Sequence, residues 1–254
     1  MRTMLDIKDL TVRFGGLTAV NQVSMHLDEG KIYGLIGPNG AGKTTFFNLI
    51  SGVCPPTSGE IYFNGTCLNG QKPYQINRAG ICRTYQVINL FKKMTVLENV
   101  LVGMHGQMQS NFAASLLHTR AERQEEREAL EKARQWLDFV GIGHLADKPA
   151  GSLPYGEQRL LEIVRALASN PRLILLDEPA AGMNSGEKEI LNGFIRKIIT
   201  ELHVTPLVIE HDMKLMMDVC DYIFVLSFGK KIAEGTPEQI QANPEVIAAY
   251  LGGE

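Results

Sequence analysis

The stretch GPNGAGKTT, from Gly37 to Thr45, constrains this chain more than any other feature of its sequence. It follows the apolar run KIYGLI and precedes TTFFNLI, so it links a predicted buried strand to a predicted helix. Small residues let the backbone curl until successive N–H groups point inward at phosphate oxygens, and the helix N-terminus adds its positive dipole end. We therefore predict a phosphate-binding loop made of Gly37, Pro38, Asn39, Gly40, Ala41, Gly42, Lys43, Thr44 and Thr45.

Two side chains of this loop have specific predicted roles. Lys43 supplies a point charge to the β- and γ-phosphates of a nucleotide, and Thr44 supplies a hydroxyl to Mg²⁺. The alternative is a glycine-rich turn without a ligand. The flanking strand and helix favour the phosphate-binding interpretation.

A second apolar run, LILLDEP, ends in the carboxylates Asp177 and Glu178. At the end of a buried strand, Asp177 suits the shell of Mg²⁺, and Glu178 suits activation of a water against the γ-phosphate. The alternative is a carboxylate pair that only caps the strand. His211, in IEHDM, ends another apolar strand. There it could contact the γ-phosphate, or it could have a structural role only. The order of these motifs favours the functional interpretation.

Strands alternate with helical patterns over most of the chain. LDIKDLTVRF and VNQVSMHLD alternate apolar and polar residues, as half-buried antiparallel strands do, whereas KIYGLIG, LILLDEP and TPLVIEHD are denser apolar runs. Helical stretches such as EKEILNGFIRKIITEL lie between them, which predicts a parallel sheet with helices on its faces. The fold class is therefore α/β: a P-loop NTPase core with a mixed sheet, parallel in its core and antiparallel at the N-terminal strands.

The middle of the chain differs, because from about Met94 to Leu167 its pattern is helical. The charged stretch AERQEEREALEKARQWLDFV gathers its apolar residues on one face, namely Leu130, Ala133, Trp136, Leu137 and Val140. We predict one domain with an α/β core at residues 1–90 and 160–242, a helical subdomain at 91–159 and a C-terminal tail at 243–254. The tail segment PEVIAAYLGG is typical of an amphipathic docking helix.

Composition argues against several classes of protein, although a local basic patch is left open. The net charge of −3 and the pI near 6.1 argue against a nucleic-acid partner. No apolar stretch approaches the ~20 residues that span a bilayer, and MRTMLDIKDL is not a signal peptide. The four cysteines form no CxxC pair, which fits a reducing cytosol.

The segment SLPYGEQ, at residues 152–158, is an unusual way to begin the helix that RLLEIVRAL predicts. Pro154 has no backbone N–H and no side-chain donor, and Tyr155 is bulky. The local sequence leaves two interpretations open: the loop only starts a buried helix, or its N–H groups contact a phosphate.

Taken together, these residues resemble the nucleotide-binding subunit of an ABC transporter over essentially the whole chain. Phe14 matches the aromatic residue that stacks on adenine in that family, with Val20 nearby, and Gln86 in RTYQVINLF resembles the glutamine that reaches Mg²⁺ and the attacking water. His211 matches the switch histidine. The resemblance implies ATP and Mg²⁺ as cofactors, Glu178, His211 and Gln86 as catalytic residues, and Thr44, Gln86 and Asp177 as residues around the metal. Two further motifs match the signature loop, Pro154, Tyr155, Gly156, Glu157 and Gln158, and the D-loop, Ala181, Gly182, Met183 and Asn184.

Several stretches resemble the branched-chain amino acid importer type in particular, among them RFGGLTAVNQVSM, DEPAAGMN and GTPEQIQANPEVIAAYLG. In that group the signature is commonly L-x-Y-G-x-Q, which accounts for Tyr155. Related ATPases serve amide or urea import, or lipopolysaccharide export. A soluble ABC-type ATPase would carry a second ATPase half or long coiled coils, and a P-loop kinase would need an acceptor site; neither fits this sequence.

The resemblance also implies partners. Such subunits bind two ATP molecules in a head-to-tail dimer, so SLPYGEQ is expected to face the partner's γ-phosphate. The helical subdomain and VINLFKKM are expected to dock a permease, at the cytoplasmic face of the cell membrane, with a substrate-binding protein acting indirectly. Pro154 stands where the family often has a serine, Glu157 brings negative charge toward an anion, and Asn184 stands where many relatives have aspartate. These departures motivate the hypothesis of a heterodimer with a second, different ATPase; a homodimer is the alternative.

Overall fold

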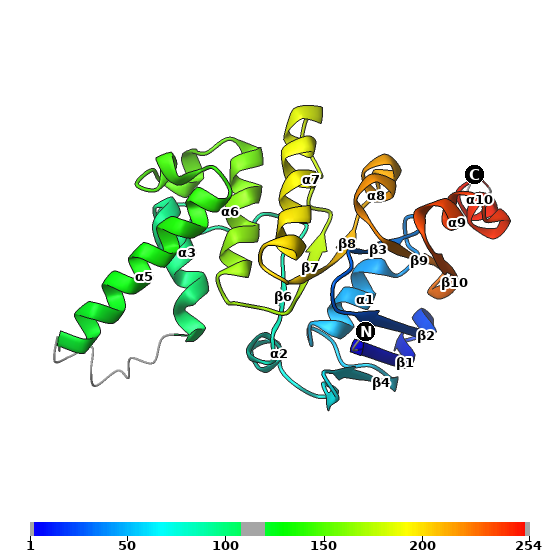
Figure 1. Cartoon of the computed structure of the whole chain (residues 1–254). Helices are drawn as coiled ribbons and strands as arrows, with labels where there is room; N and C mark the ends of the chain where they lie inside the picture. The colour runs from blue at the N-terminus through cyan, green and yellow to red at the C-terminus, as the bar shows by residue number, and fades with distance from the viewer. Residues whose placement is uncertain (1–2, 108–119, 252–254) are drawn as a thin grey trace. The chain divides into compact units, whose positions relative to one another are not determined.

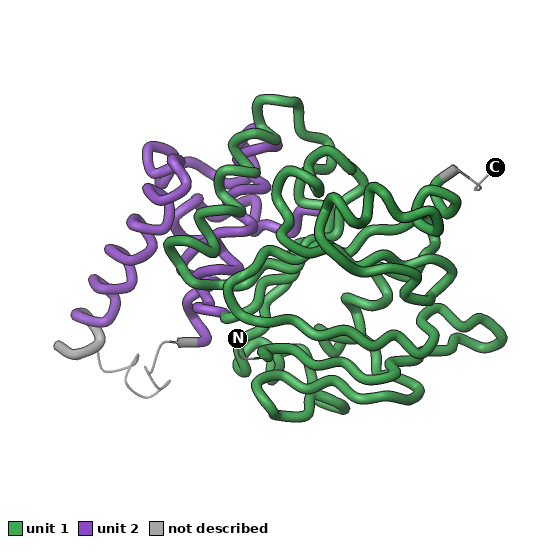
Figure 2. The backbone as a smooth tube through the Cα atoms, turned by 45° about the vertical axis from the view of Figure 1, so that its right-hand side comes forward, with its two compact units in different colours: residues 1–86, 172–254 green, residues 87–171 purple. Residues whose placement is uncertain are grey.

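The computed structural model describes residues 3–107 and 120–251 of the chain (Figure 1). The chain divides into two compact units, which Figure 2 colours separately. The first unit consists of residues 1–86 and 172–254, and the second unit of residues 87–171.

The first unit contains an antiparallel sheet with the strand order β2-β1-β4-β5. The long strands β1 and β2 pair from Thr3 opposite Asp28 to Phe14 opposite Leu17, which confirms the predicted N-terminal antiparallel strands. The bounds are β1 Thr3–Phe14, β2 Leu17–Asp28, β4 Ser58–Phe63 and β5 Thr66–Cys67.

A second sheet of the first unit has the order β10-β9-β3-β8-β7-β6, and all neighbours pair in parallel except β10 with β9. Every residue of β3, β7 and β8 is buried, as expected for parallel strands covered on both faces. The predicted combination of parallel and antiparallel strands is confirmed, with the N-terminal strands in a sheet of their own. The bounds are β3 Tyr33–Ile36, β6 Ile81–Arg83, β7 Leu173–Asp177, β8 Thr205–Ile209, β9 Tyr222–Ser227 and β10 Lys230–Gly235.

Helix α1 lies between these two sheets, and α7 and α8 lie on the other side of the six-stranded sheet (Figure 1). Phe46 of α1 joins one core with residues of both sheets, including Leu5, Leu175 and Leu207. This packing fixes the helix that follows the phosphate-binding loop. The helices of the first unit are α1 Lys43–Ile50, α2 Pro73–Ala79, α7 Ser185–Thr200, α8 Met213–Val219, α9 Pro237–Gln241 and α10 Pro244–Leu251.

The second unit is helical in its described residues. Ala133 and Leu137 of α5 are buried, so the predicted apolar face of this charged helix is the face that packs. The unit runs from Val87 to Pro171 and is longer than the predicted helical subdomain, because α6 continues unbroken to Leu167. Its elements are α3 Val96–Met104, α5 Arg120–Phe139, α6 Tyr155–Leu167 and three short 3₁₀ turns at His105–Gln107, Gly143–Leu145 and Ala150–Ser152.

None of the helices within the described residues is both long enough and apolar enough to span a membrane.

Candidate functional site

The loop between β3 and α1 adopts the curled backbone that its glycines predict. Gly37, Gly40 and Gly42 all have positive φ angles, of 151°, 78° and 99°. A Cβ atom at Gly37 would overlap the carbonyl oxygen of Leu226, and one at Gly42 would overlap that of Ala19. Glycine is therefore required here both for backbone conformation and for close packing.

Helix α1 begins directly after this loop without a side-chain cap. Gly42 is its N-cap residue, no side chain accepts a hydrogen bond from the first turn, and that turn holds no acidic residue. The N–H groups of a helix's first turn have no partner within the helix. This N-terminus therefore presents donors and a positive dipole end, which suits an anion.

Lys43, the first residue of α1, has a buried side chain that folds back over the loop. Its Nζ donates to the carbonyl oxygens of Gly37, at 2.7 Å, and Pro38, at 3.0 Å. Burial lowers the pKa of Lys43, and the carboxylates of Glu178 and Asp177 oppose this shift to a smaller extent. The ammonium group thus lies beside the loop's amides, where a phosphate would offer it charged acceptors in place of neutral carbonyls.

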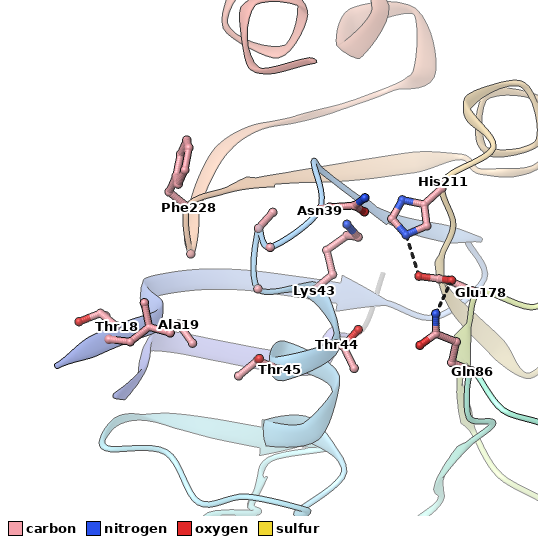
Figure 3. Close-up of a pocket in the computed structure, with 15 residues that line it drawn as sticks. Thr18, Ala19, Asn39, Lys43, Thr44, Thr45, Gln86, Glu178, His211 and Phe228 are labelled. Carbon is pink, nitrogen blue, oxygen red and sulfur yellow. Dashed lines mark hydrogen bonds and ion pairs between the residues drawn. The ribbon is translucent and has the colours of Figure 1, made fainter. Parts of the chain in front are cut away.

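A cavity of about 500 Å³ opens over the loop, and its labelled side chains come from several elements of the first unit (Figure 3). Residues Asn39 to Thr45 line one part of it, while Gln86, Glu178 and His211 line another. The structure thus brings together groups that are far apart in the sequence. The remaining lining residues are Leu17, Thr18, Ala19, Phe228 and Gly229.

Three polar residues, Gln86, Glu178 and His211, form the polar end of this cavity, and Glu178 contacts the other two. Nε2 of Gln86 donates to its Oε2 at 2.8 Å, and Nε2 of His211 lies 2.7 Å from its Oε1 (Figure 3). Glu178 has a φ of 48°, in a region that non-glycine residues seldom adopt. Such a conformation persists where the surroundings enforce it, and here the Glu178 N–H is bonded to the Ile209 carbonyl. The three predicted catalytic residues therefore meet at one carboxylate.

Asp177, at the end of β7, is buried, and only one of its two carboxylate oxygens is hydrogen-bonded within the described residues. Its Oδ2 accepts a hydrogen bond from Arg83 at 2.7 Å. Its Oδ1 is buried and has no hydrogen-bond partner among the described residues. A buried carboxylate oxygen without a partner is costly unless a ligand completes it, so Asp177 fits a place in the shell of Mg²⁺. Thr44 lines the same cavity as Gln86.

Phe14 and Val20 are not among the residues that line the cavity. Phe14 ends β1 with an exposed ring, whereas Val20 lies fully buried in the core of the first unit. The cavity wall nearby is formed instead by Thr18 and Ala19, with Phe228 across the loop (Figure 3). Contact of Phe14 or Val20 with adenine stays a prediction.

The D-loop, Ala181 to Asn184, follows Glu178 as a series of turns. The N–H of Ala181 donates to the Glu178 carbonyl, and Asn184 caps α7 through a reciprocal pair of hydrogen bonds with Glu187. Glu210 is a neighbour that the sequence motifs did not identify. It accepts hydrogen bonds from the N–H groups of Ala180, at 2.5 Å, and His211, at 3.0 Å. Burial raises the pKa of Glu210, against the effect of these amides.

The predicted signature residues lie in the second unit, at the start of α6. Pro154 is the N-cap residue, and no side chain caps the helix. Gln158 donates to the Leu153 carbonyl at 2.7 Å, Gly156 is buried and Tyr155 is exposed. The first turn keeps its N–H groups available, with Glu157 as its acidic residue. Contact with a partner's phosphate stays a prediction.

Within the predicted C-terminal tail, residues Pro244–Leu251 form α10, which packs within the first unit. Val246 is buried, and Ala248, Ala249 and Tyr250 line a cavity of about 490 Å³ together with residues Pro38 to Ala41 of the phosphate-binding loop. Burial raises the pKa of Tyr250, and the backbone N–H of Gly37 opposes this shift. The expected docking helix thus lies beside the loop of its own chain.

Comparisons with known proteins show which families this chain is similar to. The ABC transporter family matches residues 20–181, and the family described as branched-chain amino acid ATP-binding cassette transporter matches residues 230–254. The chain is 49% identical over 251 residues to the high-affinity branched-chain amino acid transport ATP-binding protein BraF of Pseudomonas aeruginosa, covering 99% of this chain and 98% of the relative. It is 46% identical over 249 residues to the corresponding protein LivG of Escherichia coli K12, covering 98% of each.

Two solved structures are also similar. One is the ADP conformation of an ATP-binding cassette of an ABC transporter, with a TM-score of 0.86, 33% identity and coverage of 100% of both chains. The other is a dimeric post-hydrolysis state of an ATP-binding cassette bound to ADP and Pi, with a TM-score of 0.77, 25% identity and coverage of 92% of this chain and 99% of that one.

The family assignment follows from full-length similarity together with the cavity over Lys43 and the polar cluster at Glu178. Membership implies ATP binding, hydrolysis coupled to transport and permease partners. The chain belongs to the ATP-binding proteins of ABC transporters, in the group of the branched-chain amino acid type.

Proposed function

We propose that this chain binds ATP with Mg²⁺ in the cavity of the first unit, hydrolyses it there, and energises the import of branched-chain amino acids through permease subunits. One observation carries the proposal. Glu178 lines the cavity over the glycine-rich loop, and Gln86 and His211 each engage one of its oxygens.

The side chains of the cavity divide the work. Lys43 exchanges its bonds to the Gly37 and Pro38 carbonyls for stronger charge-assisted bonds to phosphate oxygens. The uncapped N–H groups at the start of α1 bind the same phosphates. Glu178 accepts the proton of the attacking water through lone pairs that its two partners leave available, while Gln86 and His211 hold its position. Positioning and proton acceptance are therefore separate tasks of separate residues.

Thr44, Gln86 and Asp177 are the residues that would hold Mg²⁺. The unpartnered Oδ1 of Asp177 supports this assignment. When bound, the ion neutralises charge on the phosphate oxygens of the nucleotide.

The first test is Glu178→Gln, which removes the proton acceptor and keeps the side-chain volume. ATP turnover is expected to fall by about 10²–10⁴-fold, while binding of a fluorescent ATP analogue stays close to that of the wild type. Glu189→Gln, at an exposed position of α7, is the matched control and should leave both properties unchanged. Near-normal turnover of Glu178→Gln would refute the role of this residue.

We further infer that the chain works in a heterodimer, in which its signature loop contacts the γ-phosphate on a different ATPase subunit. The dimeric relative bound to ADP and Pi supports a dimer. Pro154 offers no hydroxyl, and the loss of one charge-assisted hydrogen bond is worth about 1.5–3 kcal/mol. Pro154→Ser should therefore raise ATP turnover only in the presence of the partner subunit. An equal increase in the isolated chain would count against the heterodimer.

Import of branched-chain amino acids is supported by the names of the similar proteins and by the family that matches the C-terminal residues. Val87, Phe91 and Met94, in the second unit, are exposed apolar residues that suit contact with a permease at the cytoplasmic face of the membrane. Purification of the native complex in mild detergent should yield permeases and a second ATPase. In proteoliposomes containing this complex and its binding protein, ATP should drive uptake of leucine, isoleucine and valine. Uptake of amides or urea instead, or export of lipopolysaccharide, would overturn the substrate assignment.

A further inference from the structure

Arg83, the last residue of β6, joins three elements of the first unit. Its side chain is 4% exposed, and Nη2 donates to Oδ2 of Asp177 at 2.7 Å. Nη1 donates to Oδ1 of Asn48 at 2.7 Å and to Oγ of Ser51 at 3.1 Å. One guanidinium group thus connects β6, the end of β7 and the helix that begins with Lys43.

Two aromatic rings hold this guanidinium group. Its Cζ lies 5.5 Å from the ring centre of Phe47 and 5.0 Å from that of Tyr85. These contacts and the forked hydrogen bonds depend on a planar group with several donors. A lysine ammonium keeps the charge but has neither the plane nor the fork.

As a result, one carboxylate oxygen of Asp177 is hydrogen-bonded and the other has no hydrogen-bond partner within the described part of the chain. Arg83 binds Oδ2, while Oδ1 remains buried without a hydrogen-bond partner among the described residues. A second contact constrains the same position, because the backbone N–H of Asp177 lies 3.4 Å from the hydroxyl of Thr84, the residue after Arg83. The orientation of Asp177 is therefore set from β6, the strand that leads to Gln86.

We propose that Arg83 is a positioning residue that turns Oδ1 of Asp177 toward the Mg²⁺ site and thereby sets how strongly Mg²⁺ tightens nucleotide binding. This inference rests on the proposed Mg²⁺·ATP site and deepens it. Arg83 acts through Asp177 and does not itself touch the nucleotide. Its bonds to Asn48 and Ser51 keep the guanidinium group from following Asp177 if that side chain rotates.

The test compares nucleotide binding with and without the metal. The dissociation constant of a fluorescent ATP analogue is measured for the full chain in excess Mg²⁺ and in EDTA, and the ratio of the two constants reports the contribution of Mg²⁺. Loss of a group that orients a metal ligand commonly costs 10–100-fold in metal affinity. In Arg83→Lys the ratio should fall by about 10-fold, while the constant in EDTA stays that of the wild type.

Two further variants complete the design. Arg172→Lys makes the same exchange in an exposed ion pair with Glu29 in the first unit and should leave the ratio unchanged. Asn48→Ala removes one anchor of Arg83 but alters neither Arg83 nor Asp177, so it should lower the ratio in the same direction by less. Thermal unfolding shows whether Arg83→Lys folds. If it does not, Asn48→Ala still tests whether the position of Arg83 affects the ratio.

Two results would overturn this inference while leaving the proposed Mg²⁺·ATP site intact. One is an unchanged ratio in folded Arg83→Lys and Asn48→Ala, and the other is nucleotide binding that weakens equally in Mg²⁺ and in EDTA. The second result would mean that Arg83 only supports the fold. If the wild type bound no nucleotide, or bound it equally well without Mg²⁺, the proposed site itself would fall, and this inference with it.

Discussion

Within its described residues, each unit of the molecule contains one deeply buried arginine–carboxylate pair. In the first unit, Arg83 and Asp177 have side chains that are 4% and 2% exposed, and in the second, Arg159 and Glu162 are 0% and 2% exposed. The nitrogen-to-oxygen distance is 2.7 Å in both. The pairs differ at the other carboxylate oxygen, because Oε1 of Glu162 accepts a hydrogen bond from the Asn89 N–H at 3.2 Å, whereas Oδ1 of Asp177 has no partner among the described residues.

This difference supports the proposal that one pair is structural and that the other leaves an oxygen for a ligand. Buried polar groups are normally satisfied within a protein, and each exception requires an explanation. Glu162 is satisfied on both oxygens and serves to fasten α6 to the segment that begins at Val87. Asp177 directly precedes Glu178, which lines the cavity, and keeps one oxygen without a partner among the described residues, which the proposed Mg²⁺ would complete. The unsatisfied oxygen, rather than the ion pair, therefore supports the proposed metal site, although Oδ1 of Asn64 and Oδ1 of Asn192 are also buried without a partner among the described residues.

The structural pair has a defined task in the second unit. Glu162 holds the backbone at Asn89, and buried Asn99 of α3 holds both the N–H and the carbonyl of Phe91. The guanidinium group of Arg165 lies 5.7 Å from the ring centre of Phe91. This short segment is therefore rigidly attached, although it carries the exposed apolar side chains proposed to meet a permease.

The largest expected effect that tests this comparison is the loss of stability in Arg159→Met. The exchange leaves the Glu162 carboxylate buried without its cation, which typically destabilises a protein by about 3–5 kcal/mol. Denaturant unfolding measures this loss. Nucleotide binding of the folded fraction should stay unchanged, because both residues belong to the second unit, whereas all residues that line the cavity belong to the first.

Two controls sharpen this prediction. Arg127→Met, at an exposed position of α5, should leave stability nearly unchanged. The double variant Arg159→Met with Glu162→Leu removes both charges and should recover much of the lost stability. If the single variant weakened nucleotide binding more than it weakened the fold, the proposed division between the two pairs would be wrong.

The next effect in size concerns the pH dependence that Glu162 gives the fold. Burial raises the pKa of Glu162, and this outweighs the opposing effect of Arg159. The folded state then binds a proton more tightly than the unfolded state. This group's contribution to stability is therefore complete below the ordinary glutamate pKa of 4.5 and is lost as the pH rises through the folded pKa. One unit of pKa shift corresponds to about 1.4 kcal/mol.

Glu162→Gln removes this titration, so the stability of the wild type relative to the variant should decrease from pH 4.5 upward and then level off. Glu210, whose pKa burial also raises, is present in both proteins and cancels in the difference. A difference that is constant with pH, or that grows as the pH rises, would contradict the raised pKa of Glu162.

The local motifs of the sequence predicted much of this molecule. The strand before Gly37, the glycine-rich loop and the helix after it follow from residues within one short stretch, and periodicity predicted the buried face of α5. The fold class followed from the alternation of apolar runs and helical patterns. These features depend on neighbours in the sequence, which is why the sequence alone was sufficient.

The contacts that the sequence did not predict join distant segments. Arg83 and Asp177 are 94 positions apart, and only the pairing of β6 with β7 brings them together. An arginine in the short apolar strand ICR was a signal for such a contact. Likewise, the N–H of Gly229 donates to the Ala41 carbonyl of the loop, its carbonyl accepts from the Asn21 N–H of β2, and the neighbouring Phe228 lines the cavity. Hydrophobic periodicity carries no information about such long-range contacts.

The contrast between satisfied and unsatisfied groups extends to the helix N-termini. Thr95, Asn184 and Thr236 cap α3, α7 and α9 through their side chains, whereas Gly42 and Pro154 leave α1 and α6 without a side-chain cap. Both of these helices are proposed to face phosphate, whereas α2, whose N-cap residue Lys72 also forms no side-chain cap, is proposed for no such contact.

The smallest expected effect follows from this difference and concerns residue 154. A serine N-cap is worth about 1 kcal/mol relative to alanine, so Pro154→Ser should be more stable than Pro154→Ala by that amount in the isolated chain. Comparing these two variants cancels the loss of proline's restriction on the unfolded chain. Asn184→Ala, which removes an existing cap from α7, should lose a similar amount relative to the wild type. Equal stability of the two residue-154 variants would mean that the start of α6 has no unsatisfied donors in the free chain. Its proposed availability to a partner's phosphate would then lose its physical basis.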